Sequence, residues 1–281
     1  MADSAKVKTK PDLGTIGGVV LAAAGIVGGL LLEGGQLSDI TQLTAAIIVL
    51  GGTFGAVLIN TPLPIVIGGL KRLKSLFFET AQPYAEVVDK MIDYATKARK
   101  AGLMALEQDA ANEPDSFLRK ALSLAADGTD LQELRKMLEI EIDQRQHHIE
   151  AEAKVFEAAG GYAPTIGIIG AVMGLIQVMK NLSDIEMVGH GIAVSFVATV
   201  YGVAASNIFF LPAANKIKAR GQADAQLQEL ILEGTVGIAE GLNPKVIRSK
   251  LEGYIPHDEL AASAKKGGGA AGAAPAAAKA A

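Results

Sequence analysis

Hydroxyl side chains recur along one apolar stretch in the second half of the chain, and hydroxyls can hydrogen-bond an ion, a water molecule or a carboxylate. The stripe consists of Ser195, Thr199, Gly202 and Ser206, at offsets of 0, 4, 7 and 11 residues. At about 100° per residue their directions differ by no more than about 60°, so the four share one helix face. In lipid, such a face turns toward protein or water and could line a pore or meet a partner. The alternative is that the hydroxyls bond their own i−4 carbonyls at an ordinary helix–helix contact.

The stripe belongs to the last of four charge-poor stretches. These are Leu13–Leu32, Ile40–Ile59, Gly160–Met179 and Val188–Leu211. Each is about as long as the roughly 20 apolar residues that cross the ~30 Å bilayer core as a helix. None contains Asp, Glu, Lys or Arg, and His190 is their only side chain that titrates near neutral pH. The pattern predicts an all-α, polytopic membrane protein with four transmembrane helices and a helical cytoplasmic domain. If the chain works with ions, another chain should bring the carboxylate.

The distribution of lysine and arginine around these stretches predicts their orientation. Basic residues precede the first stretch and follow the second and the fourth: Lys6, Lys8, Lys10, Lys71, Arg72, Lys74, Lys216, Lys218 and Arg220. The short loop Glu33–Asp39 has no basic residue, and Lys180–Met187 has one at its edge. Both termini and the insert between the second and third stretches should therefore be cytoplasmic, with the short loops outside.

The expected organisation has six parts. They are a cytoplasmic N-terminus (1–12), transmembrane helices 1 and 2 with a short periplasmic loop (13–59), a cytoplasmic helical domain (60–159), transmembrane helices 3 and 4 (160–211), cytoplasmic C-terminal helices (212–260) and a disordered Ala/Gly/Lys tail (261–281). No strand-like alternation of any length is seen, so the whole chain is expected to be helical.

The polar parts carry helix signals of their own. Expected helices are an amphipathic one at the lipid surface (Ile65–Phe78), then Pro83–Ala111, Phe117–Ala125, Leu131–Ala158, Ala213–Gly241 and a short one from Asn243-Pro244. Asp127, Thr129 or Asp130 could cap the fourth of these. Gly160–Gly161 is expected to separate Leu131–Ala158 from the third span.

Small residues form two stripes that would let helices approach closely. In the first span the stripe is Gly14, Gly18, Ala22, Gly25 and Gly29, and in the third it is Gly167, Gly170, Ala171 and Gly174. Glycine is also simply common in membrane helices, which is the alternative interpretation.

Prolines and a compact charged segment complete the candidate residues. Pro164, expected in the first turn of the third span, and Pro212, at the inner end of the fourth, each lack a backbone donor and could bend their helices. Arg99 and Glu107 would be about 80° apart on a continuous helix, so both could face one partner. A solvated helix face is the alternative for this pair.

Several function classes are disfavoured. The chain has no cysteine and a net charge of −4, which argues against thiolate metal sites and nucleic-acid binding. His147 and His148 point in different directions on a helix, so a shared metal is not expected. The sequence lacks G-x-S-x-G, H-E-x-x-H, P-loop and dinucleotide fingerprints. We therefore expect no enzyme activity and no cofactor.

Three segments resemble the motility protein A family (MotA and its sodium-driven relative PomA), within the MotA/TolQ/ExbB superfamily. They are Arg99–Glu107 (RKAGLMALE), Phe156–Ile176 (FEAAGGYAPTIGIIGAVMGLI) and Gly191–Pro212 with its hydroxyl stripe. The layout of four spans with a cytoplasmic insert is also similar to that family. The third-span segment is the most specific of the three.

The resemblance implies a subunit of the flagellar motor stator. It implies five copies around two copies of motility protein B, whose single membrane helix supplies the ion-carrying aspartate. It assigns Arg99 and Glu107 to contact with the rotor switch protein (flagellar motor switch protein G), Pro164 and Pro212 to coupling, and Thr199 to the pore beside Ser195. Sodium-driven members have threonine at the position of Ala171, so the resemblance predicts proton drive.

Two other functions stay open at this point. One is an energiser of the TolQ/ExbB type that powers an envelope transport system, a group with three spans and a differently placed cytoplasmic loop. The other is a membrane scaffold or receptor without ion flux.

Overall fold

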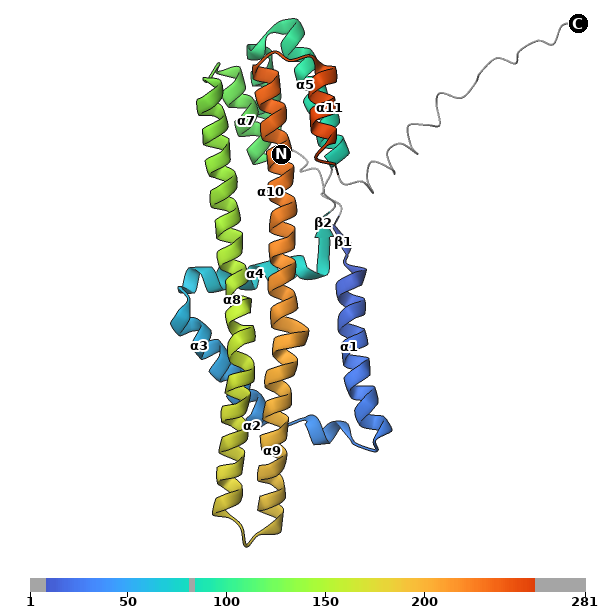
Figure 1. Cartoon of the computed structure of the whole chain (residues 1–281), viewed down its shortest axis with the longest axis vertical. Coiled ribbons are helices and arrows are strands. Elements are labelled where there is room, and N and C mark those ends of the chain that lie inside the picture. Colours follow the sequence, from blue (N-terminus) through green and yellow to red (C-terminus); the bar gives the residue numbers. More distant parts are fainter. Residues whose placement is uncertain (1–8, 81–83, 256–281) are drawn as a thin grey trace, which may run out of the picture. The chain divides into compact units, whose positions relative to one another are not determined.

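The computed structural model describes residues 9–80 and 84–255 of the 281-residue chain. In chain order the elements are β1 (Thr9–Pro11), α1 (Leu13–Leu32), the 3₁₀ turn η1 (Leu37–Ile40), α2 (Leu43–Ala46), the π-helical η2 (Ile47–Gly51), α3 (Gly52–Asn60), α4 (Leu63–Phe77), β2 (Phe78–Thr80), α5 (Tyr84–Ala101), the 3₁₀ turn η3 (Leu103–Leu106), α6 (Glu107–Asn112), α7 (Ser116–Ala126), α8 (Leu131–Lys180), α9 (Ile185–Ala204), the π-helical η4 (Ala205–Phe210), α10 (Leu211–Ala239) and α11 (Pro244–Glu252). The described chain is almost wholly helical, as expected (Figure 1).

Four helical stretches among the described residues have the length and apolar composition needed to cross a membrane. They are Leu13–Leu32, Leu37–Asn60, Leu131–Lys180 and Ile185–Ala239. The four predicted spans are therefore confirmed as candidates, although two of them form parts of much longer helices. The chain has the architecture of a multi-pass membrane protein.

Short polar side chains explain why many of these helices begin where they do. Asp12, Asp115, Asp184 and Asn243 each accept a hydrogen bond from a backbone N–H in the first turn that follows. Asp130 does the same for α8, accepting from the N–H groups of Gln132 and Glu133, and is thus the cap among the three predicted alternatives. Each cap satisfies donors that a helix start leaves unpaired.

The expected break at Gly160–Gly161 is wrong, because α8 continues through both glycines from Leu131 to Lys180. A glycine inside a helix costs only about 1 kcal/mol relative to alanine, so two of them do not end a helix whose faces are packed. A Cβ on Gly160 would lie 2.6 Å from Leu211 Cδ2. Gly160 is therefore explained by close packing rather than by a turn.

The second span is also less regular than predicted. Its helical structure is interrupted at Thr41 and Gln42 and passes through η2 before α3 begins. The phenol of Tyr201 supplies hydrogen-bond partners to the backbone at this interruption. It donates to the carbonyl of Ile40 (2.6 Å) and accepts from the N–H of Gln42 (3.2 Å). Backbone groups in lipid need such partners, and a side chain of α9 supplies them here.

A two-stranded antiparallel sheet corrects the expectation of a purely helical chain. β1 pairs with β2, with Lys10 opposite Glu79 and Pro11 opposite Phe78. The pairing continues in the N–H of Asp12, which donates to the carbonyl of Phe77 (2.9 Å). Strands of three residues are too short to show alternation in the sequence, which is why the pattern missed them.

The chain forms two compact units, which are described separately. One comprises residues 82–144 and 223–281 together with 1–6, and its described part holds a core that includes Met91, Phe117, Leu122 and Leu138. In it, Arg135 donates to Glu233 at 2.5 Å, and this bond, with a further ion pair to Lys250, lowers the pKa of Glu233. The other comprises residues 7–81 and 145–222 and contains all four charge-poor stretches.

Candidate functional site

Glycines bring α8 and α9 into direct backbone contact. A Cβ on Gly167 would lie 2.9 Å from the carbonyl oxygen of Ala198, and one on Gly174 would lie 2.7 Å from that of Gly191. From the other side, a Cβ on Gly202 would lie 2.5 Å from the carbonyl oxygen of Ala163. We call these three contacts, together with that of Gly191 on Gly174, the glycine seam. The predicted small-residue face of the third span thus packs against the fourth, as Figure 1 shows for the two neighbouring helices.

The hydroxyl stripe runs along this seam. Ser195 is 6% exposed, and its hydroxyl lies 2.8 Å from the carbonyl oxygen of Ala171 and 2.9 Å from that of Gly191. Thr199 is partly buried and donates to the carbonyl of Ser195 at 3.1 Å. The structure therefore brings together the three residues predicted for an ion path. Because their hydroxyl protons are engaged with backbone carbonyls, Ser195 and Thr199 offer lone pairs rather than donors to any further ligand.

Of the two prolines, Pro164 lies in the interior of α8, more than thirty residues after the helix begins at Leu131. The expectation that it occupies the first turn of the third span is therefore wrong, for the same reason as the break at Gly160–Gly161. An interior proline lacks the N–H that would bond the carbonyl four residues earlier, here that of Gly160. The proline is thus a site of altered helix bonding, which a proline in the first turn is not.

Pro212 stands directly after the π-helical segment η4. The N–H of Leu211 reaches back to the carbonyl of Ser206, five residues earlier. The ring of a proline collides with the carbonyl four residues before it, and widening the preceding turn into a π-helix relieves this collision. The altered helix bonding before Pro212 thus takes the form of a local π segment within an otherwise continuous helical path from α9 to α10.

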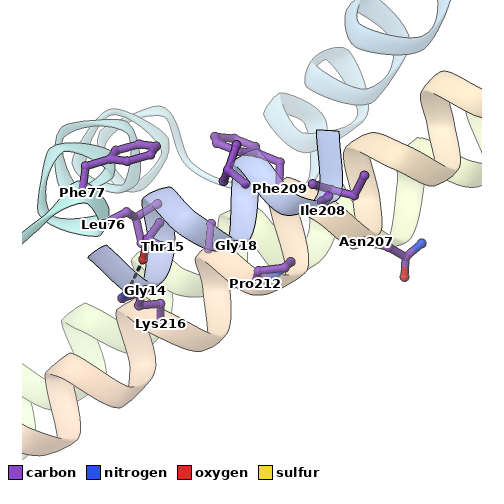
Figure 2. Close-up of a pocket in the computed structure, with 13 residues that line it drawn as sticks. Gly14, Thr15, Gly18, Leu76, Phe77, Asn207, Ile208, Phe209, Pro212 and Lys216 are labelled. Atoms are coloured by element: carbon purple, nitrogen blue, oxygen red, sulfur yellow. Dashed lines mark hydrogen bonds between the residues drawn. The ribbon is translucent and has the colours of Figure 1, made fainter. Parts of the chain in front are cut away.

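Pro212 also lines a cavity of about 370 Å³ between α1, the end of α4 and the η4–α10 junction. Figure 2 shows Gly14, Thr15 and Gly18 of α1 close to Pro212 and Lys216, with Leu76 and Phe77 at the end of α4. The lining is mostly apolar, and its polar side chains are those of Thr15, Asn207 and Lys216. Pro212 thus has free space beside it.

A polar cluster that the sequence reasoning missed holds the start of α1. Asp12 is 9% exposed and accepts from the N–H of Thr15 (2.9 Å) and from the guanidinium of Arg220 (2.8 Å), and it pairs with Lys216. The ammonium group of Lys216 also reaches the hydroxyl of Thr15. The hydrogen bonds from Lys216 and from the Thr15 N–H lower the pKa of Asp12 to about 2. A signal existed in the sequence, because an aspartate before a long apolar run is a typical helix cap.

The other compact unit carries the predicted rotor-contact pair, but not on one helix. Gly102 has φ +84°, a left-handed conformation that ends α5, and η3 then leads into α6. The assumption of a continuous helix through Arg99 and Glu107 is therefore wrong. Both side chains are exposed, one at the end of α5 and the other at the start of α6.

Three interactions stabilise this corner, which we call the α5–α6 corner (residues 97–113). Lys97 binds Asp109 at 2.6 Å across the break. Glu113 is buried and accepts from the hydroxyl of Tyr94 (2.9 Å) and from Lys90 (3.3 Å). Burial and this bond to Glu113 raise the pKa of Tyr94, so the phenol keeps its proton and donates. These bonds hold the backbone of the corner in place, and Arg99 and Glu107 lie exposed on it.

The histidines form no metal-binding cluster among the described residues. His190 is exposed near the start of α9, and His148 pairs with Glu152 (3.2 Å). No group of three or more His, Asp or Glu side chains suitable for a metal ion is found among residues 9–80 and 84–255.

Comparison with known proteins gives consistent matches. Residues 16–102 match the model "Motility protein A N-terminal", and residues 109–230 match the MotA/TolQ/ExbB proton channel family. Motility protein A of Helicobacter pylori is 36% identical over 88% of this chain and 96% of its own length. That of Bacillus subtilis is 33% identical over 89% and 93%. The structure of C. jejuni MotAB contains a chain with a TM-score of 0.83 and 34% identity, covering 88% of this chain and 97% of that one.

Proposed function

This chain belongs to the motility protein A family of flagellar stator subunits, within the MotA/TolQ/ExbB proton channel family, and we propose that it works with a motility protein B partner to turn ion flow into torque. One observation carries the proposal: similarity to motility protein A extends from the first span through the insert to α10, at nearly the full length of the relatives. The match over residues 16–102 favours a stator over a TolQ/ExbB-type energiser. A family of channel subunits also accounts for the lack of enzyme motifs.

The charge distribution supports a partner that supplies the ion-carrying carboxylate. The four charge-poor stretches contain no acidic side chain, so the chain has no anionic group of its own at mid-membrane depth. A carboxylate in lipid costs about 2.5–3.5 kcal/mol or more, which restricts it to where ions need it. We assign that role to an Asp in the single membrane helix of a motility protein B dimer, inside a homopentamer of this chain.

In this proposal Thr199, Ser195 and Ala171 line the ion path next to that carboxylate. The acceptor lone pairs of the two hydroxyls suit a cation or a protonated carboxyl. A methyl group at Ala171, rather than a hydroxyl, removes one oxygen ligand that a sodium ion would use. Proton drive is therefore our proposal for this chain.

Pro164 and Pro212 are assigned to coupling between the membrane helices and the cytoplasmic part. One elementary charge crossing the membrane yields about 2.3 kcal/mol per 100 mV. That energy is comparable with the cost of a local change in helix bonding at a proline, so ion passage can bias such a change. The α5–α6 corner, with exposed Arg99 and Glu107, is the proposed contact with flagellar motor switch protein G.

The orientation follows the positive-inside rule, with both termini and residues 60–159 cytoplasmic in a bacterial inner membrane.

Reversing the charge of Arg99 tests the assignment of the α5–α6 corner to the rotor contact. Arg99→Glu should stop or strongly slow swimming while the complex still assembles, because it changes an exposed side chain. Arg145→Glu, at an exposed position outside the corner, is the matched control and should swim normally. Normal swimming of the Arg99→Glu strain would contradict the rotor contact.

Removing a single hydroxyl tests the ion path. Thr199→Val keeps the shape of the side chain and should lower ion flux and swimming speed, while Thr199→Ser should retain both. Replacing external sodium with potassium should leave swimming unchanged if protons drive the motor. Dependence on sodium would overturn the ion assignment and leave the stator assignment standing.

A further inference from the structure

Ser206 provides a hydrogen-bond donor at the point where Pro164 removes one. Pro164 lacks the N–H that would normally bond the carbonyl of Gly160, four residues earlier in α8. The hydroxyl of Ser206 donates to this same carbonyl oxygen at 2.7 Å. Ser206 is 2% exposed, so the bond is shielded from water and from lipid. A buried carbonyl without a donor is costly, and more so at membrane depth.

The same residue takes part in the helix change before Pro212. The carbonyl of Ser206 accepts from the N–H of Leu211, which is the five-residue bond of η4. Leu211, next to Pro212, in turn packs on Gly160, where a Cβ would lie 2.6 Å from its Cδ2. Ser206 thus bonds through its side chain to the carbonyl freed by Pro164 and through its backbone to the π turn that precedes Pro212.

We propose that Ser206 is a positioning residue that links the two prolines, so that the bonding changes at Pro164 and Pro212 occur together. If α8 straightens or bends at Pro164, the carbonyl of Gly160 moves and the hydroxyl of Ser206 must follow it or lose its bond. Following it displaces the π turn, because that turn is closed on the carbonyl of Ser206. This inference rests on the proposed function, since the motion it links is the coupling step of a stator.

Ser195 shows why the arrangement at Ser206 is special. The hydroxyl of Ser195 also reaches a carbonyl of α8, that of Ala171 at 2.8 Å. However, residue 175 is leucine, whose N–H is available for the regular bond to that carbonyl. Removing the hydroxyl of Ser195 therefore leaves the carbonyl of Ala171 with its ordinary backbone donor. Removing the hydroxyl of Ser206 leaves the carbonyl of Gly160 without a donor, because Pro164 has no N–H to bond it.

A double-mutant cycle on the purified complex with motility protein B tests the link. Ser206→Ala should lower the thermal midpoint by roughly 3 °C in the native background and by less than about 1 °C in a Pro164→Ala background, where the new N–H of residue 164 can bond Gly160. Ser195→Ala is the matched control, and its shift should be the same in both backgrounds. An equal shift for Ser206→Ala with and without Pro164 would overturn the proposal.

Motility supplies a readout that stability alone would not move. Cells with Ser206→Ala should assemble stators at the native level but swim more slowly. They should also swim more slowly than cells with Thr235→Ala, which removes a buried hydroxyl outside the proposed ion path, at an equal loss of stability. Swimming at the native speed, with normal assembly, would also overturn the positioning role. If the proposed function were wrong, deleting this chain would leave swimming unchanged, while the same stability cycle repeated on the purified chain without a partner would still show the coupling of Ser206 to Pro164.

Discussion

The two stripes of small residues in this chain have the same appearance in sequence and opposite surroundings in the structure. In α8, Gly167 and Gly174 press on backbone carbonyls of α9. In α1, a Cβ added at Gly18, Gly25 or Gly29 would meet nothing within 4 Å. No residue of α1 is buried, whereas α9 buries Gly191, Ser195, Ala198 and Gly202, among others.

The difference teaches that a stripe of small residues permits a close helix–helix contact. It does not determine which helix, if any, makes that contact. Between helices in lipid, association depends on van der Waals packing and hydrogen bonds, because the lipid itself is as apolar as leucine. The α8–α9 pair has both, through the glycine seam and the bond of Ser195, and η4 adds the bond of Ser206 to α8. α1 is instead attached at its polar start, through Asp12.

The largest effect is expected where a side chain would enter the glycine seam. Gly202→Val should abolish the folded complex, because the new Cβ would lie 2.5 Å from the carbonyl oxygen of Ala163 and a backbone carbonyl cannot move aside alone. Size-exclusion chromatography of the complex with motility protein B measures the loss. Recovery of a native, monodisperse complex from Gly202→Val would show that the seam is not tightly packed.

A smaller effect is expected at the attachment of α1. Asp12→Asn removes the negative charge between Lys216 and Arg220 but keeps an oxygen that can cap the helix, so it should loosen α1 without unfolding the α8–α9 pair. The distance distribution between spin labels on α1 and α10 should broaden. Asp184→Asn, at the cap of α9, is the control and should leave that distribution unchanged.

Acidification should have the same effect as that substitution. The pKa of Asp12 is lowered from its ordinary value of 3.8 to about 2, so its ionised form is stabilised by folding. Its contribution is therefore fully present above about pH 4 and is lost as the pH falls toward and through about 2. In the spin-label experiment, α1 should loosen over this range in the native chain, while Asp12→Asn should be loose throughout. A native profile that is flat down to pH 2 would contradict the low pKa.

Ser195→Ala should have a modest effect on the seam. It removes a hydroxyl proton shared between the carbonyls of Ala171 and Gly191, and hydrogen bonds between membrane helices contribute about 0.6 kcal/mol on average. A fall in the free energy of unfolding of about 1 kcal/mol or less is expected in denaturant titrations. A loss several times larger would mean that Ser195 has a further partner in the assembled complex.

The smallest effect is expected on the open face of α1. Gly25→Val should change the stability of the purified chain by no more than about 0.5 kcal/mol, because the added side chain meets no other atom of the chain. Thermal unfolding of the chain alone measures this. A clear loss of stability would show that the stripe of α1 is packed after all, and would remove the contrast with α8.

A local rule predicted the arrangement of the hydroxyls. The 3.6-residue period placed Ser195 and Thr199 on one face, and in the structure Thr199 donates to the carbonyl of Ser195, whose hydroxyl bonds the carbonyl of Ala171. Whether that face met a pore or another helix stayed open in the sequence. The bonds to backbone carbonyls show that Ser195 and Ser206 contact α8, and the free lone pairs of the Ser195 hydroxyl are compatible with the ion path proposed for it. The pairing of Arg99 and Glu107 on a single helix failed, because the left-handed Gly102 ends α5 between them.

Interactions between distant segments could not be predicted from the sequence. The bonds of Tyr201 to residues 40 and 42, and of Arg220 to Asp12, join positions about 160 and 208 residues apart. No local period or cap signal encodes such pairs. The π turn of η4 could be predicted in part. Pro212 indicates that the helix bonding must change nearby, but it does not specify that the change is a π turn.

What the sequence alone determined is the number of apolar stretches, their lack of acidic groups and the helical period that gathers the hydroxyls on one face. These properties follow from residue type and spacing, which act within a few turns of helix. The tertiary structure alone decided that Gly160 packs against Leu211 inside an unbroken helix, and that Ser206 donates to the carbonyl that Pro164 leaves without a partner. The physical reason is that a buried backbone carbonyl must find a donor, and only the fold determines which distant side chain is near enough to provide it.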